Sequence, residues 1–228
     1  QRMKATVELL DEPTFQLDAP DVQVIGYQKT MSELGQGDIP KGAKFVEVAL
    51  NNFYNYYNSY KNYTNKGGIK VTTKSEFSSQ FGFGSSSAST VCVIKALSEL
   101  TGANLDNKTI FDLAIKTVLD IQGKGSGFDV AAATFGGTLY FVTPGKVIEP
   151  LKIDSLPLII GYSGIKADTV TLINQVSEKA TKYPEVIENI YDSISKLVEQ
   201  ANSALLSKDW QSVGELMNFN EGYLAALG

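Results

Sequence analysis

Residues 80–97, QFGFGSSSASTVCVIKAL, decide the fold, because a glycine- and serine-rich loop runs directly into an apolar segment. Gly82 and Gly84 can adopt positive φ and let another group approach the main chain closely. The serines at 85–87 then fall at the cap and first turn of a helix that we predict over 86–100. The leading N–H groups of a helix lack intrahelical acceptors and attract anions, above all phosphate. An ordinary capped helix after a tight turn is the alternative.

A second glycine-rich loop, GKGSGFDVAAATFGG at residues 123–137, follows a predicted helix. Its Asp129 comes after three glycines and precedes a run of small residues suited to close packing. A carboxylate in such a place could accept a proton from a substrate hydroxyl or pair with a cation. The alternative is an aspartate that serves only as a helix N-cap.

Composition excludes several kinds of chemistry. The chain has 228 residues, a net charge of −5, no histidine and a single cysteine, Cys92. The absence of histidine excludes Ser-His-Asp and Cys-His catalysis and histidine-ligated metals. The negative charge gives no reason to expect nucleic acid, and no apolar run approaches the roughly 20 residues of a membrane span. One cysteine among valines fits a core residue in a reducing compartment, so we expect a cytoplasmic protein.

Hydrophobic periodicity predicts an α+β chain with a mostly helical second part. Strands are expected at 3–9, 14–18, 22–27, 67–77, 138–142, 146–153 and 157–164. Helices are expected at 44–60, 86–100, 107–122, 168–183, 184–206 and 209–227. The change of pattern near residues 149–157 suggests a domain boundary, which we place after residue 152.

The two loops, in this order and with a helical hairpin between them, closely resemble those of the GHMP kinase superfamily. These are small-molecule kinases for galactose, homoserine, mevalonate and phosphomevalonate. Residues 82–88 occupy the family's G-L-G-S-S-A-A, with Phe83 for Leu and Ser87 for the first Ala, and Ser78 replaces a preceding Pro. Residues 123–137 match the family's S-G-x-D loop.

The resemblance implies a two-domain GHMP kinase fold. Residues 1–152 would form the N-terminal ATP-binding domain, which is ribosomal-protein-S5-like, with its first strand or strands missing. Residues 153–228 would begin a ferredoxin-like C-terminal domain on the substrate side and leave it incomplete. The family's P-G-K-x-x-x-x-G-E-H and G-A-G-G-G motifs are not in the chain, so it looks truncated at both ends.

The resemblance also implies a phosphotransferase that uses ATP and Mg²⁺. Asp129 would be the catalytic base, and Ser86 would ligate Mg²⁺. The residues that would hold the ATP phosphates are Gly82, Phe83, Gly84, Ser85, Ser86 and Ser87. The residues that would lie near the substrate are Lys124, Ser126, Gly127, Gly164, Lys166, Ala167 and Thr169.

The motifs point to two different acceptors, phosphomevalonate and mevalonate. Residues 82–100, 122–133 and 161–176 resemble phosphomevalonate kinases, whereas residues 214–228 resemble a helix of mevalonate kinases. We therefore expect transfer of the ATP γ-phosphoryl group to phosphomevalonate, with mevalonate as the alternative acceptor. The expected partners are ATP and the acceptor, which is phosphomevalonate or mevalonate. The oligomeric state is left open, with a homodimer as one option.

Two further functions stay open. A mevalonate-diphosphate-decarboxylase-like enzyme would also bind ATP and keep the aspartate. A non-catalytic module with this fold would lose metal ligation. The second option is favoured by Val118, which stands where mevalonate kinases carry a metal-ligating Glu, while Asp120 comes too late in the sequence to replace it.

Overall fold

The structure is a computed structural model that describes residues 2–61, 67–165 and 168–228. The chain forms two compact units. The first consists of Gln1–Gly136 and Phe141–Ile148, and the second of Gly137–Tyr140 and Glu149–Gly228. The domain boundary after residue 152 stays a prediction.

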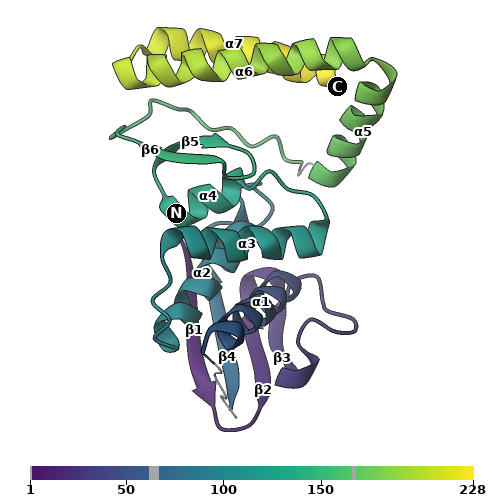
Figure 1. Cartoon of the computed structure of the whole chain (residues 1–228), viewed down its shortest axis with the longest axis vertical. Coiled ribbons are helices and arrows are strands. Elements are labelled where there is room, and N and C mark those ends of the chain that lie inside the picture. Colours follow the sequence, from purple (N-terminus) through teal and green to yellow (C-terminus); the bar gives the residue numbers. More distant parts are fainter. Residues whose placement is uncertain (1, 62–66, 166–167) are drawn as a thin grey trace. The chain divides into compact units, whose positions relative to one another are not determined.

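A four-stranded mixed sheet forms the base of the first unit (Figure 1), in the order β1-β4-β2-β3. The outer pairs β1–β4 and β2–β3 are antiparallel, and the central pair β2–β4 is parallel. Val71 of β4 therefore pairs with Val7 on one side and with Leu17 on the other. The strands are β1 (Met3–Leu10), β2 (Thr14–Ala19), β3 (Val24–Thr30) and β4 (Gly68–Ser75).

Helices cover one face of this sheet. Alternate side chains of a strand point to the same face, and on β2 the alternate residues Phe15, Leu17 and Ala19 are the buried ones. Phe53 of the first helix and Ile94 of the second are fully buried in the same core. Figure 1 shows α1 and α2 against the sheet, with α3 and α4 packed beyond them. The helices are α1 (Lys44–Lys61), α2 (Ser85–Leu100), α3 (Asn107–Gln122) and α4 (Phe128–Phe135), and two short 3₁₀ turns are η1 (Pro20–Val22) and η2 (Met31–Glu33).

A buried carboxylate fastens α1 to the edge of the sheet. Glu47 has no exposed surface and accepts hydrogen bonds from Tyr27 Oη at 2.7 Å, Lys29 Nζ at 2.9 Å and Gly35 N at 2.9 Å. A buried charge is tolerated when it is paired and hydrogen-bonded in this way. Burial, and next the hydrogen bond to Glu47, raise the pKa of Tyr27 well above its usual value. The phenol therefore stays a proton donor to Glu47.

The predicted strand at 157–164 is wrong. The antiparallel hairpin of β5 (Thr138–Val142) and β6 (Val147–Leu151) follows α4 as expected, but the described residues 152–165 form no strand. Leu158, Ile159 and Ile160 are 51%, 101% and 72% exposed. A strand needs a neighbouring strand for its hydrogen bonds, and neither of the two described sheets includes this segment. An apolar run alone does not supply that neighbour.

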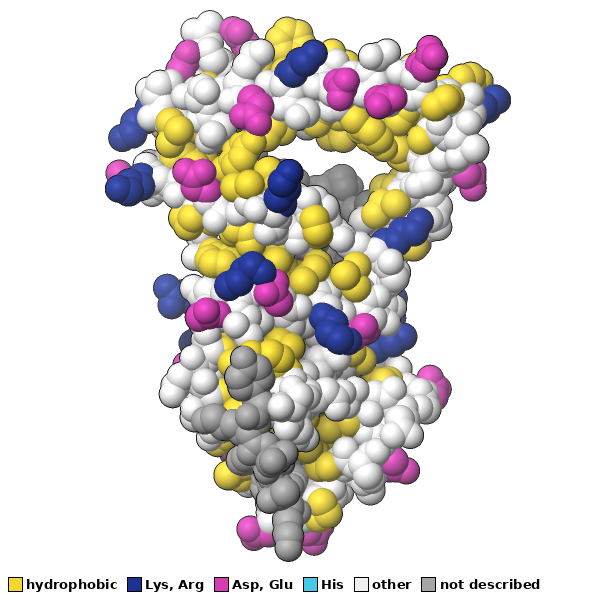
Figure 2. All heavy atoms as spheres, in the orientation of Figure 1, with side chains coloured by type: hydrophobic (Ala, Val, Ile, Leu, Met, Phe, Trp, Pro, Cys, Tyr) yellow, Lys and Arg dark blue, Asp and Glu magenta, His cyan; other side chains and the backbone are white. Residues whose placement is uncertain are grey.

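The second unit is dominated by α5 (Thr169–Lys182), α6 (Pro184–Ser207) and α7 (Trp210–Leu227), as predicted. Tyr140 of β5 donates a hydrogen bond to Glu199 of α6 at 2.6 Å. Hydrophobic side chains gather along α6 and α7 (Figure 2), and several are about half exposed. They are Val186, Tyr191, Val198, Leu206, Met217, Phe219 and Leu224. No helix among the described residues has the length and apolar character needed to cross a bilayer.

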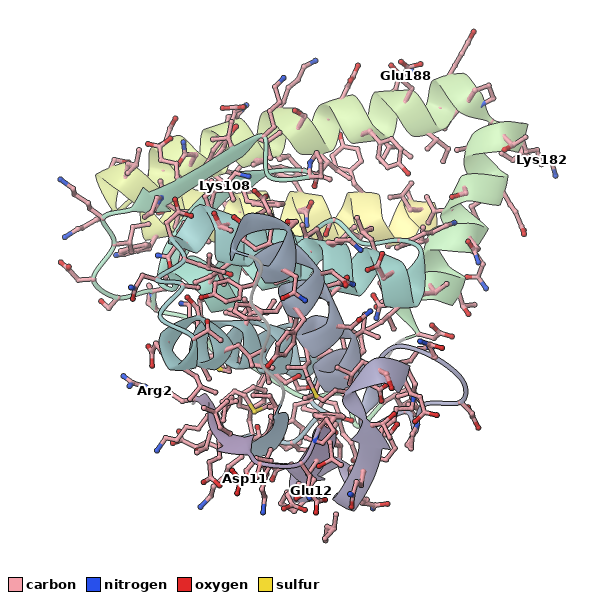
Figure 3. All side chains as sticks on the ribbon, turned by 60° about the horizontal axis from the view of Figure 1, so that its bottom comes forward. Arg2, Asp11, Glu12, Lys108, Lys182 and Glu188 are labelled. Atoms are coloured by element: carbon pink, nitrogen blue, oxygen red, sulfur yellow. The ribbon has the colours of Figure 1, made fainter. Side chains whose placement is uncertain are left out.

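Charged side chains lie on the outside of both units. Figure 3 shows Arg2, Asp11 and Glu12 extending away from the sheet of the first unit. Lys108 is also at the surface, where it pairs with Asp112 one helical turn away at 2.5 Å. Exposed pairs of this kind contribute little to stability, so the fold rests on its apolar core.

Candidate active site

The first glycine loop leaves the start of α2 uncapped. Gly84 is the N-cap with φ of +69°, and no described side chain caps the helix. The first intrahelical bond runs from Ala88 N to Gly84 O at 2.9 Å, so the amides of residues 85–87 precede it. A β-carbon on Gly84 would lie 3.4 Å from Asp129 Cβ. Glycine thus permits both the left-handed backbone and the close approach of α2 to Asp129.

The second loop ends in a helix that the sequence does not predict. Residues 128–135 form α4, which begins after Gly127, whose φ is +86°. Asp129 is the second residue of this helix, so the alternative of an N-cap aspartate is wrong. A β-carbon on Gly127 would lie 2.9 Å from Ile115 Cδ1, the end of a flexible side chain, so the positive φ is the main reason for glycine here. The small residues that follow let α4 pack against α2 and α3.

A short hydrogen bond joins the two helix starts. Ser87 Oγ donates to Asp129 Oδ2 at 2.5 Å, and Ser87 is only 2% exposed. The other carboxylate oxygen, Asp129 Oδ1, accepts from Val130 N at 3.0 Å. The structure therefore brings the serine run and the carboxylate together. The resemblance places Ser87 with the phosphate-binding residues and does not predict this contact, which depends on the packing of α2 against α4.

Ser86 lies in the first turn of α2 and is half-buried. Its carbonyl oxygen accepts from Ser89 Oγ and from Thr90 Oγ1, both at 2.9 Å. Among the described residues no group of three or more Asp, Glu, Cys or His side chains is arranged to hold a metal ion. The metal-ligand role of Ser86 stays a prediction.

Val118 and Asp120 do not supply the missing acidic ligand. Val118 is 5% exposed, and its Cγ1 lies 3.1 Å from the place of a β-carbon on Gly125. Asp120 instead binds Lys116 Nζ at 2.5 Å and Asn52 Nδ2 at 2.8 Å. Partial burial opposes ionisation of Asp120, but the hydrogen bonds from Lys116 and Asn52 outweigh it and lower its pKa.

Asp120 belongs to a separate cavity of about 360 Å³ in the first unit. The cavity lies between residues 35–39, α1 and the end of α3, and Asp129 is not among its lining residues. Lys44, Asn51 and Asn52 supply polar groups to it. Asp120 is therefore a structural partner of α1 and not part of the Asp129 site.

Aromatic side chains flank the first loop. The rings of Phe77 and Phe83 are 6.3 Å apart, and those of Phe81 and Phe83 are 5.9 Å apart. Phe81 is 41% exposed and Phe83 is 47% exposed. Phe128, which begins α4, is 65% exposed. The loop that precedes the uncapped amides thus carries an apolar surface, which a glycine loop with Leu and Ala would not offer to the same extent.

The predicted substrate residues fall into three groups. Lys124 and Ser126 lie in the loop between α3 and α4, and Gly127 is buried at its end. Gly164 and Thr169, both exposed, belong to the second unit, with Thr169 as the first residue of α5. Lys166 and Ala167 lie outside the described residues. The substrate-binding roles of all seven stay predictions.

Known proteins share this architecture. Residues 44–137 match the family described as GHMP kinases N terminal domain. The mevalonate kinases of Pyrococcus horikoshii and Pyrococcus furiosus are each 33% identical to the chain, over 226 and 232 residues. Those alignments cover 96% and 97% of this chain and 66% and 67% of the relatives. The chain therefore spans about two thirds of the length of the curated relatives it matches.

A solved structure gives the same result for the fold. The phosphomevalonate kinase of Streptococcus pneumoniae, in complex with phosphomevalonate and AMPPNP, matches with a TM-score of 0.76 and 14% identity. The match covers 97% of this chain and 70% of that one. At this identity the likeness concerns the fold alone. The chain covers 67% of the P. furiosus mevalonate kinase at 33% identity, and residues 44–137 match the family model. These two matches confirm the prediction from the loops: the chain belongs to the GHMP kinase family.

Proposed function

We propose that the protein containing this chain is a mevalonate kinase, which transfers the γ-phosphoryl group of ATP to a hydroxyl of mevalonate. The curated relatives that match nearly the whole chain are named mevalonate kinase. These relatives favour mevalonate as the acceptor. The loop motifs, taken alone, favour phosphomevalonate. The phosphomevalonate kinase structure shares the fold at only 14% identity, so it does not favour either acceptor.

One observation carries the proposal: a carboxylate lies directly against an uncapped helix start. Asp129 accepts from Ser87 Oγ at 2.5 Å and approaches Gly84 closely. Uncapped helix amides bind phosphate oxygens, and a carboxylate within hydrogen-bond reach of an acceptor hydroxyl can remove its proton. A phosphoryl donor and a hydroxyl acceptor could thus meet between α2 and α4.

The chain's own residues would divide the work as follows. The amides of residues 85–87 hold and orient the phosphates, and the exposed rings of Phe81 and Phe83 border the loop. The acceptor oxygen attacks the γ-phosphorus, the bond to the β-phosphate oxygen breaks, and ADP leaves. Asp129 takes the proton of the acceptor hydroxyl. Phosphoryl transfer of this kind depends mainly on positioning and charge neutralisation.

Oxygen groups at the site fit a hard cation as a partner of the nucleotide. Ser86 would contribute such an oxygen, and phosphate oxygens would complete the shell, while Asp129 would act as the base. Mg²⁺ bound with ATP supplies neutralisation of the phosphate charge.

Phosphomevalonate is the second candidate acceptor, and it is favoured by residues 82–100 and 122–133, which resemble phosphomevalonate kinases. Val118, a buried apolar residue where the resemblance to mevalonate kinases implies an acidic metal ligand, favours a non-catalytic module instead. A phosphate acceptor is already anionic at neutral pH, so it needs less help from a base. Asp129 would then act by orientation.

The test is an ATP-consumption assay of the full-length protein with mevalonate, phosphomevalonate and mevalonate diphosphate. We expect turnover with mevalonate, and we expect Asp129→Asn to lower kcat by about 10²- to 10⁴-fold, the usual contribution of a general base. ATP binding by that variant, measured by calorimetry, should persist. The matched control is Asp112→Asn, since Asp112 is an exposed partner of Lys108 on α3.

Other outcomes would replace the proposal. Turnover with phosphomevalonate and not with mevalonate would replace mevalonate by phosphomevalonate as the acceptor. Release of CO₂ from the diphosphate would indicate a decarboxylase. No turnover with any acceptor, with ATP binding intact, would favour a non-catalytic module. Near-normal turnover by Asp129→Asn would contradict the role of Asp129.

A further inference from the structure

We propose that Ser87 is the positioning residue of Asp129: its hydroxyl holds the carboxylate in the orientation needed to meet the acceptor. This inference rests on the proposed function, since it concerns the group that would receive the acceptor proton. It gives Ser87 a role different from binding phosphate through its side chain.

The hydrogen bond has the character of a specific contact. Ser87 Oγ lies 2.5 Å from Asp129 Oδ2, in the range of hydrogen bonds between a hydroxyl and an ionised carboxylate. Ser87 is 2% exposed, so solvent competes little for its hydroxyl. A hydroxyl has one proton to donate. That proton is used on Asp129 and is not available to a phosphate.

The carboxylate is restrained from both helices. Oδ2 is held by Ser87 from α2, and Oδ1 is held by the amide of Val130 in α4. Gly84 lies nearby, because a β-carbon added there would be in van der Waals contact with Asp129 Cβ, at 3.4 Å. Each carboxylate oxygen has a second lone pair, so Asp129 can still accept a proton from a substrate. Removing the hydroxyl would free Oδ2 and leave only the weaker restraint from its own helix.

Ser87 also connects the two halves of the site. Its amide belongs to the uncapped start of α2, while its hydroxyl reaches Asp129 on α4. The side chain therefore sets the position of the carboxylate relative to the amides that would hold the phosphates. At the corresponding position the family motif has alanine, which cannot donate a hydrogen bond to the carboxylate.

The experiment replaces Ser87 by alanine in the full-length protein and measures steady-state kinetics with mevalonate and ATP. We expect kcat to fall by about 10- to 100-fold, the size of effect that misplacement of a catalytic group by about 1 Å produces. KM for both substrates should change by less than about twofold. Ser87→Thr retains the hydroxyl and should recover kcat to within about threefold of the wild type.

The matched control is Ser89→Ala, on the same helix. The Ser89 hydroxyl donates to Ser86 O at 2.9 Å and has no bond to Asp129. We expect kcat for this variant to stay within about twofold of the wild type. An equal loss in Ser87→Ala and Ser89→Ala, or an unchanged kcat in Ser87→Ala, would overturn the inference.

A second measurement does not need activity. A double-mutant cycle of Ser87→Ala and Asp129→Ala, followed by urea unfolding, reports the coupling between the two side chains, because alanine at either position removes the hydrogen bond. We expect the double variant to be less destabilised than the sum of the two single variants, and additive effects would overturn the contact. A wild-type protein that phosphorylates none of the acceptors would overturn the proposed function, and the cycle would still decide whether Ser87 holds Asp129.

Discussion

Five helices of this chain begin in two different ways. In α3, α5 and α7 the N-cap is an aspartate, and its carboxylate accepts a hydrogen bond from a backbone amide of the first turn. The cap distances are 2.8 Å from Asp106 to Thr109 N and 3.1 Å from Asp209 to Ser212 N. In α2 and α4 the N-cap is a left-handed glycine, and no described side chain caps either helix.

The aspartate caps and the glycine caps have different physical effects: the first stabilise a helix, and the second leave its amides open to a ligand. An aspartate cap satisfies an amide and complements the positive end of the helix. A glycine cap in its place costs only a few tenths of a kcal/mol, but it leaves the amides open to an external anion. The two glycine-capped helices are the two that meet at Ser87 and Asp129. Helix α6, whose N-cap is Tyr183, also begins without a side-chain cap. We propose that a ligand at the open starts of α2 and α4 accounts for their glycine caps.

Giving α2 an aspartate cap should have the largest effect. In Gly84→Asp the new carboxylate would lie beside Asp129, at the amides that would hold the phosphates. Like charges in contact cost several kcal/mol. We therefore expect ATP affinity to fall by at least about 100-fold. Calorimetric titration with ATP measures this.

The control for that variant is Gly102→Asp. Gly102 lies beyond the other end of α2 with φ of +66°, and no described atom lies within 4 Å of an added β-carbon. The backbone strain is comparable, so ATP binding should survive. If Gly84→Asp bound ATP as the wild type does, the open start of α2 would not be a phosphate site.

Removing an aspartate cap should have a moderate effect of a different kind. Asp106→Ala leaves the first turn of α3 without its carboxylate, and we expect the melting temperature to fall by about 2–4 °C. ATP affinity should not change. Differential scanning calorimetry gives the first quantity and titration the second. Loss of ATP binding in this variant would contradict the idea that aspartate-capped helix starts serve stability and glycine-capped ones serve binding.

The smallest effect is a change in pH dependence. The hydrogen bond from Thr109 N, and next that from the Thr109 hydroxyl, lower the pKa of Asp106 below its usual 3.8. A carboxyl with a lowered pKa in the folded state stabilises the protein above the unfolded-state value and loses that contribution as the pH falls through the folded-state value. Asp106→Asn keeps a capping oxygen but does not titrate.

The wild type should therefore lose more stability than Asp106→Asn when the pH is lowered from 5 to below 3.8. Urea midpoints of the two proteins across that interval test the sign. Parallel curves would show that the cap does not depend on ionisation.

The sequence predicts most of the first unit because its signals are local. The alternation in β1 and β2 and the helical spacing in α1 and α3 are produced by burial on one face, and the structure has these elements in the expected places. The segment at 157–164 shows the limit of such signals. Its apolar residues predict a strand, but strand formation depends on a partner elsewhere in the chain.

The site was predictable in outline and not in detail. The glycine loops predict an open helix start and a nearby carboxylate, and the structure places Ser87 and Asp129 in contact. The hydrogen bond itself depends on the packing of α2 against α4, which no local pattern reports. The same holds for Asp120, whose bonds to Lys116 and Asn52 depend on the contact between α1 and α3.

The position of β4 in the middle of the sheet has a consequence for the dynamics of the loop. Its amides and carbonyls are engaged by β1 on one side and by β2 on the other, and the glycine loop begins a few residues after it ends. Backbone deuterium uptake should therefore be slow through Val71 and fast at the amides of residues 85–87, which precede the first bond of α2. A nucleotide that occupied those amides would slow their exchange and leave the strand unchanged, so the loop would act as a local reporter of occupancy next to a strand that is paired on both sides.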